Sequence, residues 1–153
     1  MKKQGGFLNS FGYAFKGIVD AIKNERNFRI HLCMMVYVLI FAAIGTPPRD
    51  DMARLILCFG LVLSAELVNT ALESVCDAVT EEKSEKIKTA KDAAAGAVLL
   101  SAIISAIVGL ITFLEPDVFR RIMSKLCAVP ILAVLIAFSI PLAVWFIIGR
   151  KRK

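Results

Sequence analysis

Four long apolar stretches constrain the fold of this chain more than any other feature of its sequence. They cover residues 30–44, 55–76, 93–114 and 126–148. Because a helix of about 20 apolar residues crosses the hydrocarbon layer of a bilayer, each stretch predicts a membrane span. The first stretch is short and needs a helical extension through Asn27. With 58% hydrophobic residues the chain is too apolar for a soluble core, so we expect an all-α membrane protein with four spans.

Basic residues flank the predicted spans and indicate their orientation. The net charge is +6, and fourteen of the 19 Lys and Arg residues fall on one side of the membrane when the spans alternate in direction. Cytoplasmic loops carry the excess of Lys and Arg in membrane proteins, so the sequence predicts that both termini are cytoplasmic. The basic residues are scattered along short loops and do not form one basic face, which argues against a nucleic-acid partner.

The segment before the first span, residues 7–24, predicts an amphipathic helix. Phe7, Phe11, Phe15 and Ile18 recur at helical spacing, whereas the polar residues point in other directions. Two placements are open for this helix. It lies in the membrane interface with its aromatic side chains among the headgroups, or it packs on the protein's own spans.

A stripe of polar residues runs along the second span. Glu66, Asn69, Glu73 and Asp77 lie within an arc of about 80°, because successive helical residues turn by about 100°. Carboxylates within a membrane helix are costly unless they are hydrated, protonated or paired, so the stripe indicates a functional site. The helical rise puts Glu73 near the cytoplasmic mouth and Glu66 roughly 10 Å deeper.

The two depths suggest two tasks for the stripe. Glu73, close to water, is suited to hold a cation, whereas Glu66 is suited to accept a proton from a lipid alcohol near the interface. Two other interpretations are open: helix association through hydrogen bonds, chiefly from Asn69, and a path through a small channel or transporter subunit. A path across the membrane would need polar residues in the outer halves of the spans, which have almost none.

Further charged residues lie on the same predicted side of the membrane. Glu25 precedes the first span. Lys91 and Asp92 stand at the start of the third, where a predicted loop of mixed charge at residues 80–92 ends. Mg²⁺ prefers a few carboxylates together with phosphate oxygens, so Glu25 and Glu73 are a candidate metal pair. Lys91 is a candidate contact for nucleotide phosphates, although neither of the common glycine-rich phosphate-binding motifs occurs.

These motifs together resemble the small prokaryotic diacylglycerol kinase and undecaprenol kinase family. The resemblance covers residues 7–116, and its most specific parts are residues 65–73 with Asp77, and residues 90–99. Residues 12–17 and 24–31 add to it in the same order and spacing. The resemblance implies an integral membrane lipid kinase that transfers phosphate from ATP, with Mg²⁺, to a membrane lipid alcohol. It also implies a homotrimer in the bacterial inner membrane.

The resemblance also implies roles for individual residues. Glu66 is similar in position to the catalytic base, with Asn69 beside it, and Glu25 and Glu73 to the metal-binding pair that also contacts ATP. Further nucleotide contacts are implied for Tyr13, Glu82, Lys83, Ser84, Lys91 and Asp92. The lipid substrate is expected to meet Glu66, Phe28 and His31.

Two features bear on the substrate and on the domain organisation. Residues 27–31 resemble the undecaprenol branch of the family more than the diacylglycerol branch, which tends to carry an acidic residue at the position of His31. We therefore expect undecaprenol as the acceptor, with diacylglycerol as the alternative. The family normally ends after three spans, so we divide the chain into a kinase core, residues 1–116, and an additional fourth span with a basic tail, residues 117–153.

Overall fold

The computed structural model of the chain describes residues 7–79 and 84–149, and these residues are helical almost throughout. The helices are α1 (Phe7–Asn24), α2 (Arg26–Gly45), α3 (Arg49–Val79), α4 (Glu85–Leu114), α5 (Pro116–Ala128) and α6 (Pro130–Ile148). No strand occurs in this part of the chain. The predicted all-α class is confirmed.

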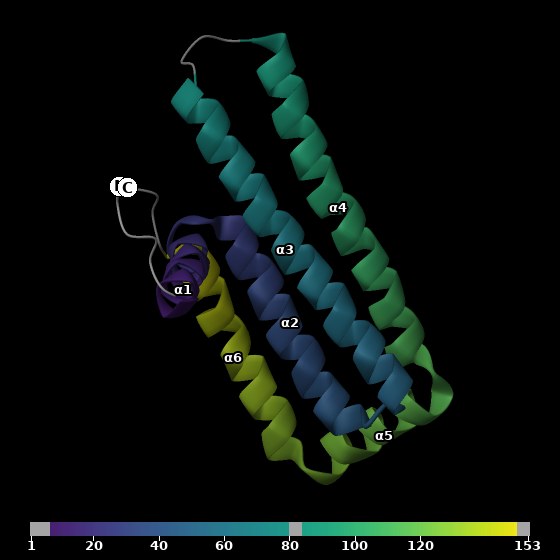
Figure 1. Ribbon diagram of the computed structural model, residues 1–153. Coiled ribbons are helices and arrows are strands. Elements are labelled where there is room, and N and C mark those ends of the chain that lie inside the picture. The colour runs from purple at the N-terminus through teal and green to yellow at the C-terminus, as the bar shows by residue number, and fades with distance from the viewer. Residues whose placement is uncertain (1–6, 80–83, 150–153) are drawn as a thin grey trace.

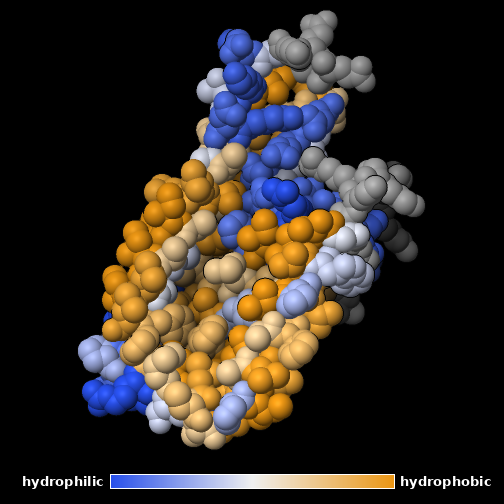
Figure 2. All heavy atoms as spheres, turned by 180° about the vertical axis from the view of Figure 1, so that it is seen from behind, coloured by the Kyte–Doolittle hydropathy of each residue, from blue (hydrophilic) through white to orange (hydrophobic). Residues whose placement is uncertain are grey.

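Four helices, α2, α3, α4 and α6, are long and apolar enough to cross a membrane. They lie side by side, with α1 across one end and α5 near the other (Figure 1). Apolar side chains cover the middle of the visible surface and polar side chains gather towards its ends (Figure 2). The protein is therefore a multi-pass membrane protein. The first span begins at Arg26, which confirms the predicted extension through Asn27.

Helix α1 leaves its aromatic side chains exposed. Among the α1 side chains that the structure describes, only Ala21 is buried, whereas Phe11, Tyr13 and Phe15 are exposed. Exposed aromatic residues on a helix across the end of a membrane bundle suit the headgroup region. Ala21 is buried and α1 contacts α2 and α3, so both placements left open by the sequence stay predictions.

Helices α3 and α4 form the longest pair and pack closely along their length. They extend past α1 at the C-terminal end of α3 and the N-terminal end of α4 (Figure 1). The predicted loop at residues 80–92 is wrong for its second half, because residues 85–92 form the first turns of α4. Ser84 occupies the N-cap position and Glu85 lies in the first turn, where the helix dipole favours a negative charge.

The predicted start of the fourth span, residue 126, is also wrong. Residues 116–128 form a separate amphipathic helix, α5, and the span α6 starts at Pro130. The Glu115 carboxylate caps α5 by accepting a hydrogen bond from the backbone N–H of Val118 at 2.8 Å. Pro130 has no N–H to donate and disfavours helical geometry at Val129, so the two helices are separated there.

Helix α5 packs against the end of α2 through a close approach at Gly45. Val118 and Ile122 are buried there, and a Cβ atom at Gly45 would lie 2.9 Å from Val118 Cγ1 and 3.0 Å from Ile122 Cδ1. Arg121 Nε donates to the carbonyl oxygen of Gly45 at 2.7 Å. This contact packs α5 against the end of α2, the first span.

Candidate active site

The polar stripe of α3 begins with two buried side chains. Glu66 is 2% exposed and Asn69 is 6% exposed, whereas Glu73 is half-buried and Asp77 is exposed. Glu66 Oε2 and Asn69 Oδ1 have no hydrogen-bond partner within the described residues. Buried polar atoms are nearly always hydrogen-bonded in folded proteins, so two unpartnered acceptors on one helix face indicate a place where a ligand binds.

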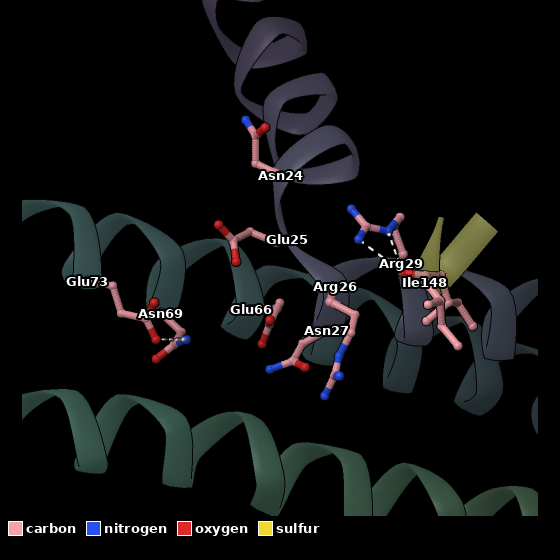
Figure 3. A pocket seen from close by; sticks show the side chains of 10 residues that line it. Asn24, Glu25, Arg26, Asn27, Arg29, Glu66, Asn69, Glu73 and Ile148 are labelled. Atoms are coloured by element: carbon pink, nitrogen blue, oxygen red, sulfur yellow. Dashed lines mark hydrogen bonds between the residues drawn. The ribbon is translucent and has the colours of Figure 1, made fainter. Parts of the chain in front are cut away.

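The turn between α1 and α2 brings a second set of polar side chains to this face. Glu25 lies at that turn with an extended backbone, φ −100° and ψ 115°, and it faces the part of α3 that carries Glu66 and Glu73 (Figure 3). A cavity of about 580 Å³ lies between them. Its lining residues are Asn24, Glu25, Arg26, Asn27, Arg29, Glu66, Asn69, Glu73, Ile147 and Ile148.

The lining of the cavity contains three carboxylates and two guanidinium groups. The carboxylates belong to Glu25, Glu66 and Glu73, and the guanidinium groups to Arg26 and Arg29. Arg29 is buried and donates to backbone carbonyl oxygens. Arg26 is exposed, and no hydrogen bond or ion pair joins it to another described residue. Arg26 is therefore the cation of this lining that is available to an anionic ligand.

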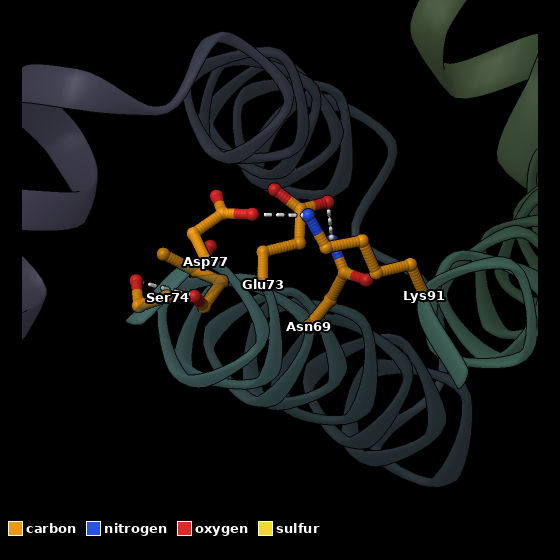
Figure 4. Close-up of polar contacts among 6 residues, drawn as sticks. Asn69, Glu73, Ser74, Asp77 and Lys91 are labelled. Carbon is orange, nitrogen blue, oxygen red and sulfur yellow. Dashed lines mark hydrogen bonds and ion pairs between the residues drawn. The ribbon is translucent and has the colours of Figure 1, made fainter. Parts of the chain in front are cut away.

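Two side-chain contacts hold the carboxylates of the stripe that lie towards the C-terminal end of α3. Asn69 Nδ2 donates to Glu73 Oε1 at 3.1 Å within α3, so this bond does not join two helices. Lys91 reaches across from α4 and forms an ion pair with Asp77 (Figure 4). The hydrogen bond of Asn69 thus gives no support to the helix-association interpretation, and the pair of Lys91 with Asp77 ties α3 to α4 beside the cavity.

Comparison with known proteins identifies the family. The sequence model for prokaryotic diacylglycerol kinases matches residues 12–113, which is well over half of the chain. The chain belongs to the prokaryotic diacylglycerol kinase family. As a member of this family it is a membrane lipid kinase, and the channel or transporter interpretation is set aside.

Relatives of this kinase carry two different names. An undecaprenol kinase from Bacillus subtilis is 40% identical over 108 residues, which cover 71% of this chain and 88% of the relative. A diacylglycerol kinase from Synechocystis is 46% identical over 110 residues, covering 71% of this chain and 63% of the relative. The diacylglycerol kinase of Escherichia coli K12 is 30% identical over 65% of this chain and 82% of its own length. No solved structure matches the chain significantly.

Some of the predicted site residues line the cavity of this kinase, and others lie outside it. Glu25, Glu66, Asn69 and Glu73 line it together. Among the described residues, the predicted nucleotide contacts that do not line it are Tyr13, Ser84, Lys91 and Asp92, and the predicted lipid contacts that do not line it are Phe28 and His31. Tyr13 is 72% exposed on α1, and Phe28 is buried in α2. Glu82 and Lys83 lie outside the described residues.

The oxygen ligands of the cavity fit the divalent cation that the family implies. No group of three or more His, Cys, Asp or Glu side chains suited to a metal occurs in the described parts of the chain. Mg²⁺, however, usually takes one or two carboxylates and completes its shell with phosphate oxygens and water. Glu25 and Glu73 both line the cavity, so these two carboxylates would fit a nucleotide-linked ion of this kind.

Sequence reasoning assigned no site role to six lining residues: Asn24, Arg26, Asn27, Arg29, Ile147 and Ile148. The position of Arg26 next to Glu25 was a usable signal, because the first turn of α2 must face the same polar site. The contribution of Ile147 and Ile148 had no signal in the sequence. They lie in an apolar helix without polar periodicity and reach the cavity only through tertiary packing.

Proposed function

We propose that this lipid kinase transfers the terminal phosphate of ATP to undecaprenol. The observation that carries the proposal is the buried carboxylate of Glu66, with one oxygen unpartnered, in the same cavity as Glu25, Glu73 and Arg26. A base at this depth is suited to an alcohol that stays anchored in the membrane, while the charged groups nearer the α1–α2 turn suit Mg²⁺ and phosphates.

The reaction requires alignment and charge neutralisation more than covalent chemistry by the protein. In the proposed step the hydroxyl oxygen of the lipid bonds to the γ-phosphorus, the bond from that phosphorus to the oxygen of ADP breaks, and Glu66 takes the hydroxyl proton. Glu25 and Glu73 would hold Mg²⁺, which neutralises charge on the phosphates. Asn69 holds the carboxylate of Glu73. Lys91, which is ion-paired with Asp77 outside the cavity lining, would add positive charge near the entrance of the site.

Undecaprenol is proposed as the acceptor for two reasons. The Bacillus subtilis undecaprenol kinase aligns over 88% of its length, and residues 27–31 resemble that branch. The Synechocystis diacylglycerol kinase has the higher identity, 46%, but only 63% of its length is covered. Diacylglycerol is therefore the alternative acceptor.

We further propose a homotrimer in the bacterial inner membrane, with both termini cytoplasmic. Tyr13 and Asp92 do not line the cavity of their own chain, and both are exposed, so a neighbouring subunit is a candidate to meet them. The last residues of α6 and the α1–α2 turn line the same cavity, which is consistent with two ends on one side of the membrane. Chemical crosslinking in mild detergent tests the trimer.

The acceptor is tested with purified protein, ATP labelled in its γ-phosphate, and Mg²⁺. Undecaprenol and diacylglycerol are compared at equal mole fraction in the same detergent, because a membrane enzyme responds to surface concentration. We expect labelled undecaprenyl phosphate to form faster than labelled phosphatidic acid. A preference for diacylglycerol would overturn the acceptor and keep the kinase, whereas transfer to neither lipid would overturn the proposed reaction.

A further inference from the structure

The fourth span reaches the kinase cavity although it lies beyond the matched residues 12–113. Ile147 and Ile148, at the end of α6, line the cavity together with Glu66. No α6 side chain is buried, and the helix packs mainly on α2 and α5. The proposed phosphate transfer does not by itself explain why the additional span, α6, ends at this cavity.

Arg29 connects this end of α6 to the α1–α2 turn. Its side chain is 2% exposed, and its hydrogen bonds to described residues all go to backbone carbonyl oxygens. Nε and Nη2 donate to the oxygen of Ile147 at 3.3 Å and 3.0 Å. Nη1 donates to the oxygens of Ile22 and Lys23, each at 3.1 Å. One guanidinium group therefore joins the last turn of α1 to the last turn of α6.

The electrostatics of helix ends explain why this arrangement is stable. The last carbonyl groups of a helix have no partner within the helix and carry partial negative charge, so a cation there is favourable. A buried guanidinium that loses its acceptors is costly, because hydrogen bonds to charged groups are worth more than neutral ones. If α6 moved away, Nε and Nη2 of Arg29 would lose the carbonyl oxygen of Ile147.

The Arg29 side chain, which bridges α1 and α6, belongs to a residue one helical turn after Glu25. Glu25 occupies the N-cap position of α2, and the backbone N–H of Arg29 donates to its carbonyl oxygen at 3.3 Å. The backbone N–H of Glu25 donates to Ala21 at the end of α1 at 2.8 Å. The backbone of Glu25 is thus held between the two elements that the Arg29 side chain connects to α6.

We propose that the fourth span is a positioning element of the kinase site, and that it acts through Arg29 to hold Glu25 opposite Glu73. This inference rests on the proposed role of Glu25 in binding Mg·ATP. Arg29 is a positioning residue, because its donors are taken up by carbonyl oxygens and not by substrate. Loss of the bridge should therefore affect the affinity for Mg·ATP more than the affinity for the lipid.

The test uses Arg29→Lys, which keeps the charge but cannot donate to three carbonyl oxygens with a planar group. Arg29→Gln also removes the positive charge and is expected to have the larger effect. Arg121→Lys is the matched control, since Arg121 also donates from its guanidinium to a helix-end carbonyl, that of Gly45, near α5. We expect KM for Mg·ATP to rise about tenfold in Arg29→Lys, the size expected for losing one charge-assisted bond, with KM for the lipid within about twofold. Both KM values should be unchanged in Arg121→Lys.

A second measurement does not depend on activity. Nitroxide labels at exposed Lys16 in α1 and exposed Val144 in α6, in a background without the four native cysteines, report the distance between the two helices. We expect a narrow distribution in the parent protein and a broadened one in Arg29→Lys and Arg29→Gln, with Arg121→Lys resembling the parent.

The outcomes separate this inference from the proposed function. A broadened distance with an unchanged KM for Mg·ATP would show that Arg29 only anchors α6, and would overturn the positioning role. An unchanged distance and an unchanged KM would overturn the bridge itself. If the parent protein phosphorylated neither lipid but the distance still depended on Arg29, the proposed function would be wrong and the bridge between α1 and α6 would stand.

Discussion

The side-chain amide of Asn69 donates a 3.1 Å hydrogen bond to Oε1 of Glu73, one turn further along α3. Asn69 is buried and Glu73 is half-buried, so the bond holds the carboxylate at the edge of the cavity. The second oxygen of Glu73 forms no hydrogen bond or ion pair with a described residue and is available to a cation. The amide of Asn69 thus acts on Glu73, while its own oxygen, Oδ1, has no partner among the described residues.

The first prediction concerns this pair. Asn69→Ala should weaken Mg·ATP binding by about tenfold, because the Glu73 carboxylate loses a charge-assisted hydrogen bond. Glu73→Gln should weaken it further, since the proposed metal ligand itself is lost. Binding is measured by titration of the purified variants, with Asp117→Asn on α5 as the control. Unchanged binding in Asn69→Ala would show that the bond does not position Glu73.

The second prediction concerns the available cation in the cavity. Arg26→Gln should lower kcat by about tenfold or more, because phosphoryl transfer depends on neutralising charge in the transition state. Arg26→Lys should retain more activity, since it keeps the charge. Lys23→Gln removes the same charge from the exposed last turn of α1, outside the cavity lining, and is the control. Equal losses in Arg26→Gln and Lys23→Gln would point to a general effect of net charge.

The third prediction concerns the packing of α5 on α2. Gly45→Ala should lower stability by about 1–3 kcal/mol, because its Cβ would lie 2.9 Å from Val118 Cγ1 in a buried contact. Gly60→Ala is the matched control, since a Cβ there meets nothing within 4 Å. Thermal unfolding in detergent measures both variants. If Gly45→Ala and Gly60→Ala had the same Tm, Val118 and Ile122 would be able to move away from the added Cβ without a loss of stability.

The spans and the polar stripe could be predicted because each depends on local spacing. Apolar length identifies α2, α3, α4 and α6, and the helical period gathers Glu66, Asn69 and Glu73 on one face of α3. The same reasoning placed Glu25 on the same side of the membrane, and the structure shows that it lines the same cavity.

The remaining features depend on contacts between distant residues. Helix α5 was missed because Arg120, Arg121 and Lys125 interrupt the apolar pattern, and its cap at Glu115 and its packing at Gly45 appear only in the folded chain. Arg29 was read as part of a motif, whereas its side chain donates to Ile147, 118 residues away. No periodicity in the sequence relates those two positions.

The fourth prediction concerns topology. Reporter fusions at Lys153 should read a cytoplasmic C-terminus, because fourteen of the 19 basic residues fall on the side that holds both termini. Fusions within the α5 helix should read the opposite side, since α4 and α6 flank it as spans. An external signal at Lys153 would mean that α6 does not cross the membrane.

The last prediction separates the base from the nucleotide site. Glu66→Gln keeps the size of the side chain but cannot take a proton, so it should lower kcat by at least ~10²-fold, the lower range for losing a general base. Glu66 lies deeper along α3 than Glu73, and one of its carboxylate oxygens is unpartnered, so Mg·ATP binding should stay within about threefold of the parent. Single-turnover phosphate transfer to undecaprenol measures the first quantity and nucleotide titration measures the second. Asp117→Asn, an acidic residue on α5 near the other end of the bundle, should leave both unchanged. If Glu66→Gln and Glu73→Gln lose nucleotide binding equally, the division of roles between the two carboxylates is wrong, and if Glu66→Gln retains full turnover, another group removes the proton.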